Sequence, residues 1–291
     1  MKKLVVWTLL AVMFFAAVSI GCGGSSSETS TDSGQNESLN DDTGSTDPNS
    51  GGRGNSDEPV DLSTLTDHYT AQNGDILTGT LGSPFPIRVA DGATITLRNV
   101  TINGEILSSY LFVGFRCVGD ATLILEGTNY VQTCCPTYPA IYIPKGHTLT
   151  IKGTGKLTAD ASSTFSAGIG GGASLSCGNI EIEGGTIEAR GGNYSAGIGG
   201  GWRVNCGNIM IDGGTINATG GNLGAGIGGG YYGNCGTITI TKNVTKVTAT
   251  KGDDAKHSIG AGESSSCGTV TVGDEVGAVS TTPYTYPPDK Q

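Results

Sequence analysis

The chain has 291 residues, of which 26 are acidic and 16 basic, so its formal net charge is −10. This acidic balance, without any stripe of basic residues, excludes the electrostatic footprint of a nucleic-acid-binding protein. Glycine occurs 50 times and only 36% of the residues are hydrophobic, so a core has to be built from regularly spaced apolar positions.

Residues 1–22 predict a targeting segment that is not part of the fold. Two lysines precede a mostly apolar run that ends at Ile20, and Gly21-Cys22 follows. The Gly-Cys end resembles a bacterial lipoprotein signal, which implies that Cys22 is lipidated. The mature protein would then be held at the outer membrane or cell surface by its lipid. An ordinary secretory signal and an uncleaved anchor are the alternatives.

Residues 23–62 predict a disordered acidic tether. The stretch contains nine carboxylates and one arginine, so it carries −8 of the net charge. It has almost no large apolar side chain whose burial could offset the entropy of ordering. We therefore expect the folded part to span residues 63–280, closed by a Pro-rich tail at 281–291.

Within the folded part, apolar and polar residues alternate in short stretches that end at Gly-Gly or Asn-Gly, as in half-buried strands. Pairs of the form Ile-x-Ile recur in steps of 28, 26, 31, 29, 29 and 32 residues. These pairs are Ile95/Leu97, Leu123/Leu125, Leu149/Ile151, Ile180/Ile182, Ile209/Ile211, Ile238/Ile240 and Val270/Val272. A period near 29 indicates units that stack on their neighbours. The sequence thus predicts an all-β, single-domain, right-handed parallel β-helix of about seven coils.

The repeat is clearest in the second half of the chain. AGIGGG-x4-CGNI occurs at 167–180 and 196–209, AGIGGG-x4-CGTI at 225–238, and a weaker HSIGAG-x4-CGTV at 257–270. Together with ATITL, DATLILEGTN and GHTLTIKGTG upstream, these copies resemble the carbohydrate-binding β-helix domains of secreted bacterial proteins, whose fold is similar to that of pectate lyases. The resemblance implies a polysaccharide ligand. It also makes calcium a candidate cofactor, because some of those domains bind acidic plant polysaccharide with calcium.

The loops after Gly-Gly-Gly predict a sugar-binding platform. Aligning the copies by their cysteines places Trp202 and Tyr231 in one column, and Arg203 and Tyr232 in the next. In a stack of coils, neighbouring members of a column would lie roughly 4.8 Å apart. Aromatic faces stack on sugars, and arginine binds hydroxyl or carboxylate groups. The alternative is a small satellite cluster that packs over the loop.

Gly197, Gly199, Gly226 and Gly228 predict a second part of the same surface. If the Ala and Ile of each AGIG stretch point inward, these glycines point outward. The outer face would then be bare backbone that a flat ligand can approach closely. The alternative is that glycine relieves crowding at a corner of each coil.

The residue two positions before each AGIGGG copy is Phe165, Tyr194 and Leu223 in turn. Strand parity with the Ala and Ile of the copy points these side chains inward. We therefore expect them in the core and not on a binding wall.

Glu183 and Asp212 occupy one column, between Lys152 and Thr241. Stacked carboxylates repel each other unless a cation lies between them, and oxygen ligands suit calcium. The two carboxylates are therefore the candidate metal ligands. The alternative is a solvated charge ladder in which Lys152 pairs with Glu183.

The eight cysteines leave seven for the folded protein if Cys22 is lipidated. Four of them stack in register, one in each copy of the repeat. These are Cys177, Cys206, Cys235 and Cys267. Their spacing permits disulfides, but parallel side chains make the geometry awkward, so we expect reduced thiols. Cys117 with Cys134 or Cys135 is the expected bridge.

No catalytic set emerges from these columns. Arg190 and Arg203, with Glu183 and Asp212, supply the charges that a polysaccharide lyase needs, but the two types lie in different columns. We therefore expect a surface or periplasmic lipoprotein that binds polysaccharide and is not an enzyme. The alternatives are an adhesive or structural repeat protein with a protein partner, and a polysaccharide lyase.

Overall fold

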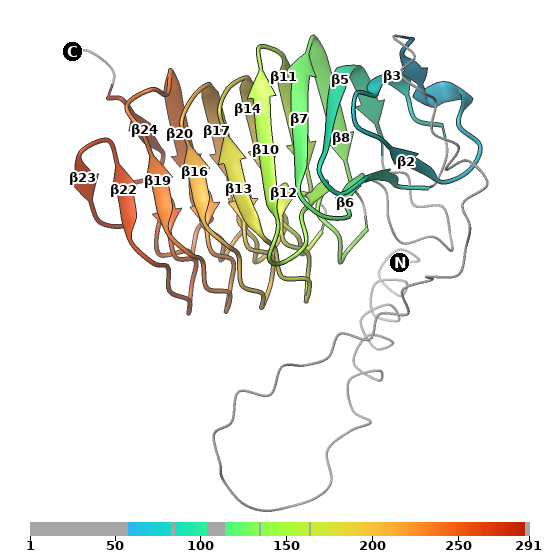
Figure 1. Ribbon diagram of the computed structural model, residues 1–291. Helices are drawn as coiled ribbons and strands as arrows, with labels where there is room; N and C mark the ends of the chain where they lie inside the picture. Colours follow the sequence, from blue (N-terminus) through green and yellow to red (C-terminus); the bar gives the residue numbers. More distant parts are fainter. Residues whose placement is uncertain (1–57, 83–84, 104–113, 134, 163, 289–291) are drawn as a thin grey trace, which may run out of the picture. The chain divides into compact units, whose positions relative to one another are not determined.

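The computed structural model describes residues 58–82, 85–103, 114–133, 135–162 and 164–288. These residues form a parallel β-solenoid of about six complete turns (Figure 1). Among them the only helical element is a single 3₁₀ turn, η1 (Leu62–Thr64). The predicted all-β parallel β-helix with a repeat of about 29 residues is confirmed.

Three rows of parallel strands form the faces of the solenoid. The first row is a sheet of β2 (Tyr69–Ala71), β4 (Ile87–Val89), β6 (Phe115–Cys117), β9 (Ile141–Tyr142), β12 (Ile169–Gly170), β15 (Ile198–Gly199), β18 (Ile227–Gly228) and β21 (Ile259–Gly260). The second row is β3 (Ile76–Thr80), β5 (Ala93–Ile102), β7 (Ala121–Glu126), β10 (Thr148–Gly153), β13 (Asn179–Ile182), β16 (Ile209–Ile211), β19 (Ile238–Ile240) and β22 (Val270–Val272). The third row is β8 (Thr128–Gln132), β11 (Lys156–Asp160), β14 (Thr186–Arg190), β17 (Thr215–Thr219) and β20 (Lys246–Thr250). The long strand β5 pairs with both β7 and β8, and this pairing joins the second and third rows into one sheet.

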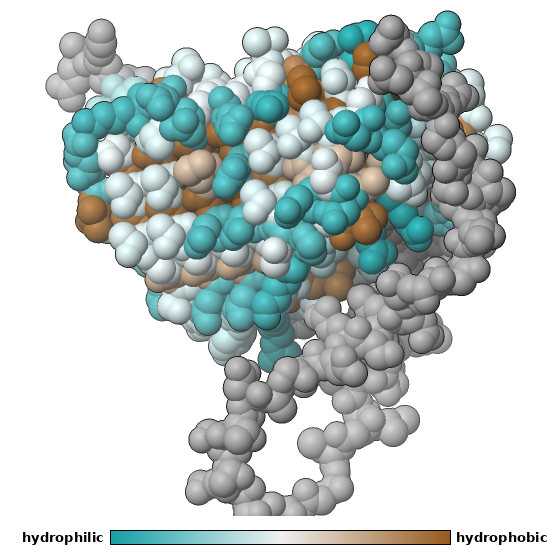
Figure 2. All heavy atoms as spheres, in the orientation of Figure 1, coloured by the Kyte–Doolittle hydropathy of each residue, from teal (hydrophilic) through white to brown (hydrophobic). Residues whose placement is uncertain are grey.

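The core is a set of ladders in which equivalent residues of successive coils stack. One ladder of the second row is fully buried along its length. Its members are Ile95, Leu123, Ile151, Ile182, Ile211, Ile240 and Val272. The outer face of this row is mostly polar, and Figure 2 shows it largely in white and teal with narrow brown rows. Alternation along each strand therefore separates one continuous core from the solvent.

The register differs from the prediction at one point. The sequence pattern equates Leu123 with Leu149, whereas the structure pairs Leu123 with Ile151 and Ala121 with Leu149. The steps along this column are therefore 28, 28, 31, 29, 29 and 32 residues. A slip of two residues keeps every side chain on the same face, so alternation alone cannot detect it.

The boundaries of the fold also differ from the prediction. β1 (Val60–Asp61) pairs with β3, and Leu62 is fully buried, so the solenoid includes the last residues of the expected tether. At the other end, β24 (Tyr284–Tyr286) pairs with β20 and makes part of the expected tail a strand. The polar composition of both segments gave no sign that they are part of the fold, because each buries only a few side chains.

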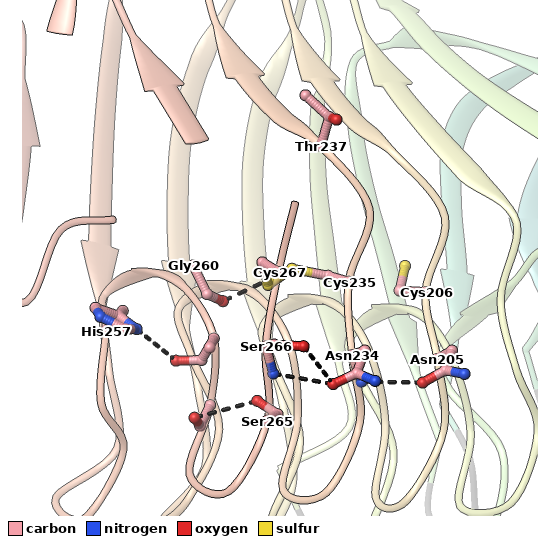
Figure 3. The surroundings of a disulfide bond; sticks show 12 residues. Asn205, Cys206, Asn234, Cys235, Thr237, His257, Gly260, Ser265, Ser266 and Cys267 are labelled. Atoms are coloured by element: carbon pink, nitrogen blue, oxygen red, sulfur yellow. Dashed lines mark hydrogen bonds between the residues drawn. A yellow bond between two sulfur atoms is a disulfide. The ribbon is translucent and has the colours of Figure 1, made fainter. Parts of the chain in front are cut away.

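The turns between strands are connected by ladders of side-chain amides. The side-chain oxygen of Asn205 accepts a hydrogen bond from the backbone N–H of Asn234 (3.0 Å), and that of Asn234 accepts from Ser266 (2.9 Å), as Figure 3 shows. Asn179 and Asn208 form a second ladder of the same kind, three residues later in each coil. Each amide satisfies a backbone donor that the next coil would otherwise leave unpaired.

Candidate functional site

The candidate site is built on a two-residue turn that follows Gly-Gly-Gly in three coils and Gly-Ala-Gly in a fourth. The second residue of this turn has a positive φ in every copy. These residues are Ser174 (64°), Arg203 (61°), Tyr232 (56°) and Ser264 (53°). Glycine is the residue that this backbone region favours, and a bulky side chain there is uncommon. Four coils thus carry exposed non-glycine side chains at a position where glycine would cost less.

Backbone hydrogen bonds hold the turns of successive coils in register. The N–H of Trp202 donates to the carbonyl of Phe165 (3.3 Å), and that of Tyr231 donates to Tyr194 (2.7 Å). The N–H of Arg203 donates to the carbonyl of Tyr231 in the next coil (2.8 Å). The side chains on these turns therefore project from a fixed ladder.

Five rings gather at these turns, three on the turns themselves and two from the segments that precede AGIGGG. Together with Arg203 we call them the aromatic turn cluster. The rings are Phe165, Tyr194, Trp202, Tyr231 and Tyr232. Tyr194 is central, with ring centroids 5.9 Å from Phe165, 6.1 Å from Trp202 and 5.6 Å from Tyr231. Tyr231 and Tyr232 are 4.2 Å apart. The structure thus brings together the four predicted platform residues in one continuous cluster.

Arg203 is the cation of this cluster. Its guanidinium lies 5.3 Å from the ring centroid of Trp202 and 5.9 Å from that of Tyr232. Arg203 is exposed and Tyr232 is 54% exposed, whereas Trp202 and Tyr231 are half-buried. The pKa of the Tyr231 phenol is raised, mainly by its hydrogen bond with Tyr232. Flanking rings restrain the guanidinium while its N–H edge remains able to donate to a ligand.

Phe165, Tyr194 and Leu223 were predicted to be core residues, and this prediction is wrong. All three are half-buried, and the two aromatic ones join the aromatic turn cluster. The strand to which parity was applied is only two residues long in each coil, as in β12 and β15, so alternation does not reach back to these positions. The equal spacing of the two aromatic ones from Trp202 and Tyr231 is the signal that would have found them.

The four glycines predicted as an exposed binding face are buried. A Cβ on Gly199 would meet the carbonyl oxygen of Gly228, and a Cβ on Gly197 would meet the backbone of Thr219. Gly226 and Gly228 face Thr250 and Gly260 in the same way. These glycines allow backbones to approach at a corner of the coil, so the bare face does not exist.

The predicted metal ligands directly follow β13 and β16 and are not members of the aromatic turn cluster. Glu183 is exposed, and the carboxylate of Asp212 accepts hydrogen bonds from the Thr241 hydroxyl (2.7 Å) and the Asn243 amide (3.0 Å). The expected ion pair of Lys152 with Glu183 is not among the salt bridges of the described residues. Whether calcium binds this column stays a prediction.

Asp91, Asp120 and His147 are a group that could hold a metal ion, with ligand atoms within 4.8 Å of one another. The Asp91 carboxylate accepts a hydrogen bond from the N–H of Asp120 (2.9 Å), and the Asp120 carboxylate accepts from Thr148 (2.8 Å). These contacts repeat the ladder of the asparagines. The two aspartates therefore have a structural role, which is to accept hydrogen bonds from backbone N–H groups of the next coil.

The repeat cysteines form disulfides, so the expected reduced stack is wrong. Cys177 pairs with Cys206 and Cys235 with Cys267, with Cα–Cα distances of 4.7 and 4.4 Å. These residues precede the strands of the second row and lie outside them, so strict alternation does not fix their side-chain directions.

Cys117 and Cys135 are free and buried, so the bridge expected between them is not formed. Cys134 and Cys22 lie outside the described residues. Burial raises the pKa of the Cys117 thiol to about 12, which keeps it protonated and unreactive at neutral pH.

No helix among the described residues is long and apolar enough to cross a membrane. Residues 149–173, 180–202 and 209–231 match a family described as beta helix repeat. The matches start at Leu149, Ile180 and Ile209, which are strand partners of one another. The fold and these matches together define the chain as a β-helix repeat protein. Searches of curated proteins and of solved structures gave no match.

Proposed function

We propose that this protein binds polysaccharide, without catalysis, through the aromatic turn cluster. One observation carries the proposal: Arg203 and Tyr232 project into solvent from turn positions that favour glycine. Side chains kept at strained backbone positions mark functional sites, because the strain has to be offset elsewhere in the fold. Rings offer apolar faces and edges to sugar C–H groups, and the guanidinium offers donors to sugar hydroxyls or carboxylates.

The spacing of the cluster supports a polymeric ligand. Successive turns are one strand spacing apart, roughly 4.8 Å along the solenoid axis. A polymer that lies along the axis would therefore meet a turn in each coil. Several weak contacts of this kind add up along a repeat surface, whereas one isolated sugar would touch only one or two turns.

The test exchanges turn sequences within the repeat. Trp202→Ala with Arg203→Ser, and Tyr231→Ala with Tyr232→Ser, give the second and third copies the Ala173-Ser174 turn of the first copy. Each lost ring should weaken binding by about 1 kcal/mol. We expect polysaccharide retention in affinity electrophoresis to be lost in the quadruple variant, while its circular dichroism spectrum still shows the folded solenoid.

The control is Tyr130→Thr, which places on β8 the residue that its partner Thr158 carries on β11. It removes a half-buried ring outside the cluster and should leave retention unchanged. Wild-type retention by the quadruple variant would contradict the proposal and favour a scaffold with a protein partner. Release of unsaturated sugar products would instead identify a lyase. Loss of retention with chelator, reproduced by Asp212→Asn, would assign calcium to Glu183 and Asp212.

We propose further that Cys22 carries a lipid that anchors the solenoid to the outer membrane or cell surface, with the acidic segment as a spacer. The support is the Gly21-Cys22 sequence after an apolar run. Cys22→Ala should move the protein from the membrane fraction to the soluble fraction. A variant that partitions with membranes as the wild type does would show that lipid is not the anchor.

A further inference from the structure

The last coil ends in a pocket whose lining includes Cys267, one of the two cysteines of a disulfide. The pocket has a volume of about 400 Å³ and lies between the last coil and the returning segment 276–278. Its lining includes Lys256, His257, Ser265 and Cys267. We propose that Cys235–Cys267 is an exchangeable disulfide that small anionic thiols open from this pocket, while Cys177–Cys206 stays closed.

The first argument is the exposure of the four cysteines. Cys177, Cys206 and Cys235 are 2%, 7% and 7% exposed, because a further coil covers each of them. Cys267 is half-buried, since it belongs to the last coil, and Figure 3 shows it at the end of the row of cysteines. Thiol–disulfide exchange needs attack on a reachable sulfur atom, so Cys267 is the point of entry.

The second argument is the charge of the pocket. Lys256 and His257 stand where the two preceding coils carry Ser195-Ala196 and Gly224-Ala225. None of the described residues that line the pocket is acidic. A basic environment stabilises a thiolate and attracts an anionic thiol.

The third argument is the state of His257. Its Nδ1 lies 3.1 Å from the carbonyl oxygen of Ala261, and a carbonyl only accepts, so Nδ1 carries the hydrogen. This hydrogen bond holds the imidazole ring in place at the lining of the pocket. By their chain positions, both basic side chains of the pocket, Lys256 and His257, belong to the last coil.

The reaction balances with a small thiol as the named co-reactant. A thiolate attacks Cys267 Sγ, a mixed disulfide forms there, and the bond to Cys235 Sγ breaks, leaving a Cys235 thiolate that takes up a proton. A second thiol attacks the mixed disulfide and releases the Cys267 thiol. Two small thiols are oxidised to their disulfide and one protein disulfide is reduced.

Opening this bond should not unfold the last coil. The N–H of Cys235 donates to the carbonyl of Ser266 (2.9 Å), and the N–H of Gly268 donates to Cys235 (3.0 Å). These backbone bonds keep the two cysteines adjacent, so the exchange is reversible.

The test treats the full chain with reduced glutathione, an anionic thiol, and traps free thiols with N-ethylmaleimide over time. Peptide mapping should find the glutathione adduct on Cys267 and the maleimide on Cys235. We expect both modifications to appear on the order of tenfold sooner than any label on Cys177 or Cys206. Labelling of the two pairs at the same rate, or an adduct on Cys235 in place of Cys267, would overturn the proposal.

Two matched variants test the pocket itself. Lys256→Ser and His257→Ala restore the residues of an earlier coil, Ser195-Ala196, and should slow the reaction with glutathione several-fold. The rate with 2-mercaptoethanol should fall less in Lys256→Ser than the rate with glutathione, because the attacking 2-mercaptoethanol thiolate lacks the carboxylates that glutathione also carries. An unchanged glutathione rate in Lys256→Ser would contradict the role of the pocket.

Discussion

At the scale of single residues, glycine sets how closely the coils can stack. Gly170, Gly199 and Gly228 have φ values of 131°, 129° and 133°, which L side chains rarely adopt. A Cβ on any of them would also meet the carbonyl oxygen of the equivalent glycine in the next coil. Both the backbone conformation and the space therefore require glycine at this corner.

Gly199→Ala tests this requirement. The strained φ should cost about 1–3 kcal/mol and the overpacking about 1–3 kcal/mol more, so the thermal transition should fall markedly. Gly82→Ala is the control, because Gly82 has no positive φ and nothing within 4 Å of its added Cβ. The two variants should separate clearly in a melt followed by circular dichroism. Equal transitions would show that the corner tolerates a side chain.

A second residue-scale prediction concerns pH. Lys156 Nζ donates to the Glu188 carboxylate at 3.0 Å, and this contact lowers the pKa of Glu188 below its ordinary value. Because the folded-state pKa lies below the unfolded one, the pair stabilises the fold above the unfolded pKa. That contribution is lost as the pH falls through the folded pKa. Both side chains are about one-third exposed, so we expect less than about 1 kcal/mol.

The measurement is the pH dependence of unfolding for wild type and Glu188→Gln. The difference between the two should be largest near neutral pH and vanish in acid. Glu181→Gln is the control, since Glu181 lies outside the salt bridges of the described residues. A difference that grows on acidification would reverse the assigned sign.

At the scale of strands, the apolar ladders of the second row hold the coils together. Ile211 on β16 stacks between Ile182 and Ile240 and is fully buried, whereas its neighbour Met210 is 37% exposed. Ile211→Asp would bury an unpaired charge shared by three coils and should cost more than about 4 kcal/mol. Met210→Asp, on the same strand, should cost about 1 kcal/mol or less. Similar thermal transitions for the two variants would contradict the assigned faces of the strand.

The strands were predictable from sequence where alternation ran over several residues. Ile180-Glu181-Ile182 is buried, half-buried and buried, as its pattern indicates, and β13 pairs with β16 in the predicted register. The pairing of β10 with β7 was not predictable, since three apolar positions on β7 offer two registers of equal parity. The two-residue strands of the first row carry too few residues for parity, and the errors at Phe165, Tyr194 and the glycines all follow from this.

The candidate site was predictable only in part, for a related reason. Alignment of the repeats by their cysteines placed Trp202 beside Tyr231 and Arg203 beside Tyr232, because equal spacing fixes a column whatever its conformation. It could not show that the second column adopts a positive φ. Contacts between different columns, such as Tyr194 with Trp202, depend on the path of the turns, and a one-dimensional repeat does not encode that path.

At the scale of the whole solenoid, each end of the coil stack needs a cap. The last strands would otherwise offer unpaired backbone groups to another chain. β23 (Glu275–Val276) runs antiparallel to β22, β24 runs antiparallel to β20, and Val279 forms an antiparallel bridge with Ile259 of β21. The returning C-terminal segment therefore covers the terminal strand of all three rows, and the change from parallel to antiparallel pairing stops the repeat.

Removing residues 281–291 should turn this capped end into an adhesive one. The deletion removes β24 and leaves the edge of β20 without its partner, while β21 and β22 keep their covers. We expect concentration-dependent self-association, measured by light scattering after size-exclusion chromatography, with the melting temperature lowered only slightly. A chain that ends at Pro288 keeps β24 and should behave as the full chain does. If the shorter chain shows no more association than this control, a bare β20 edge is not adhesive, and the tail serves the stability of the last coil alone.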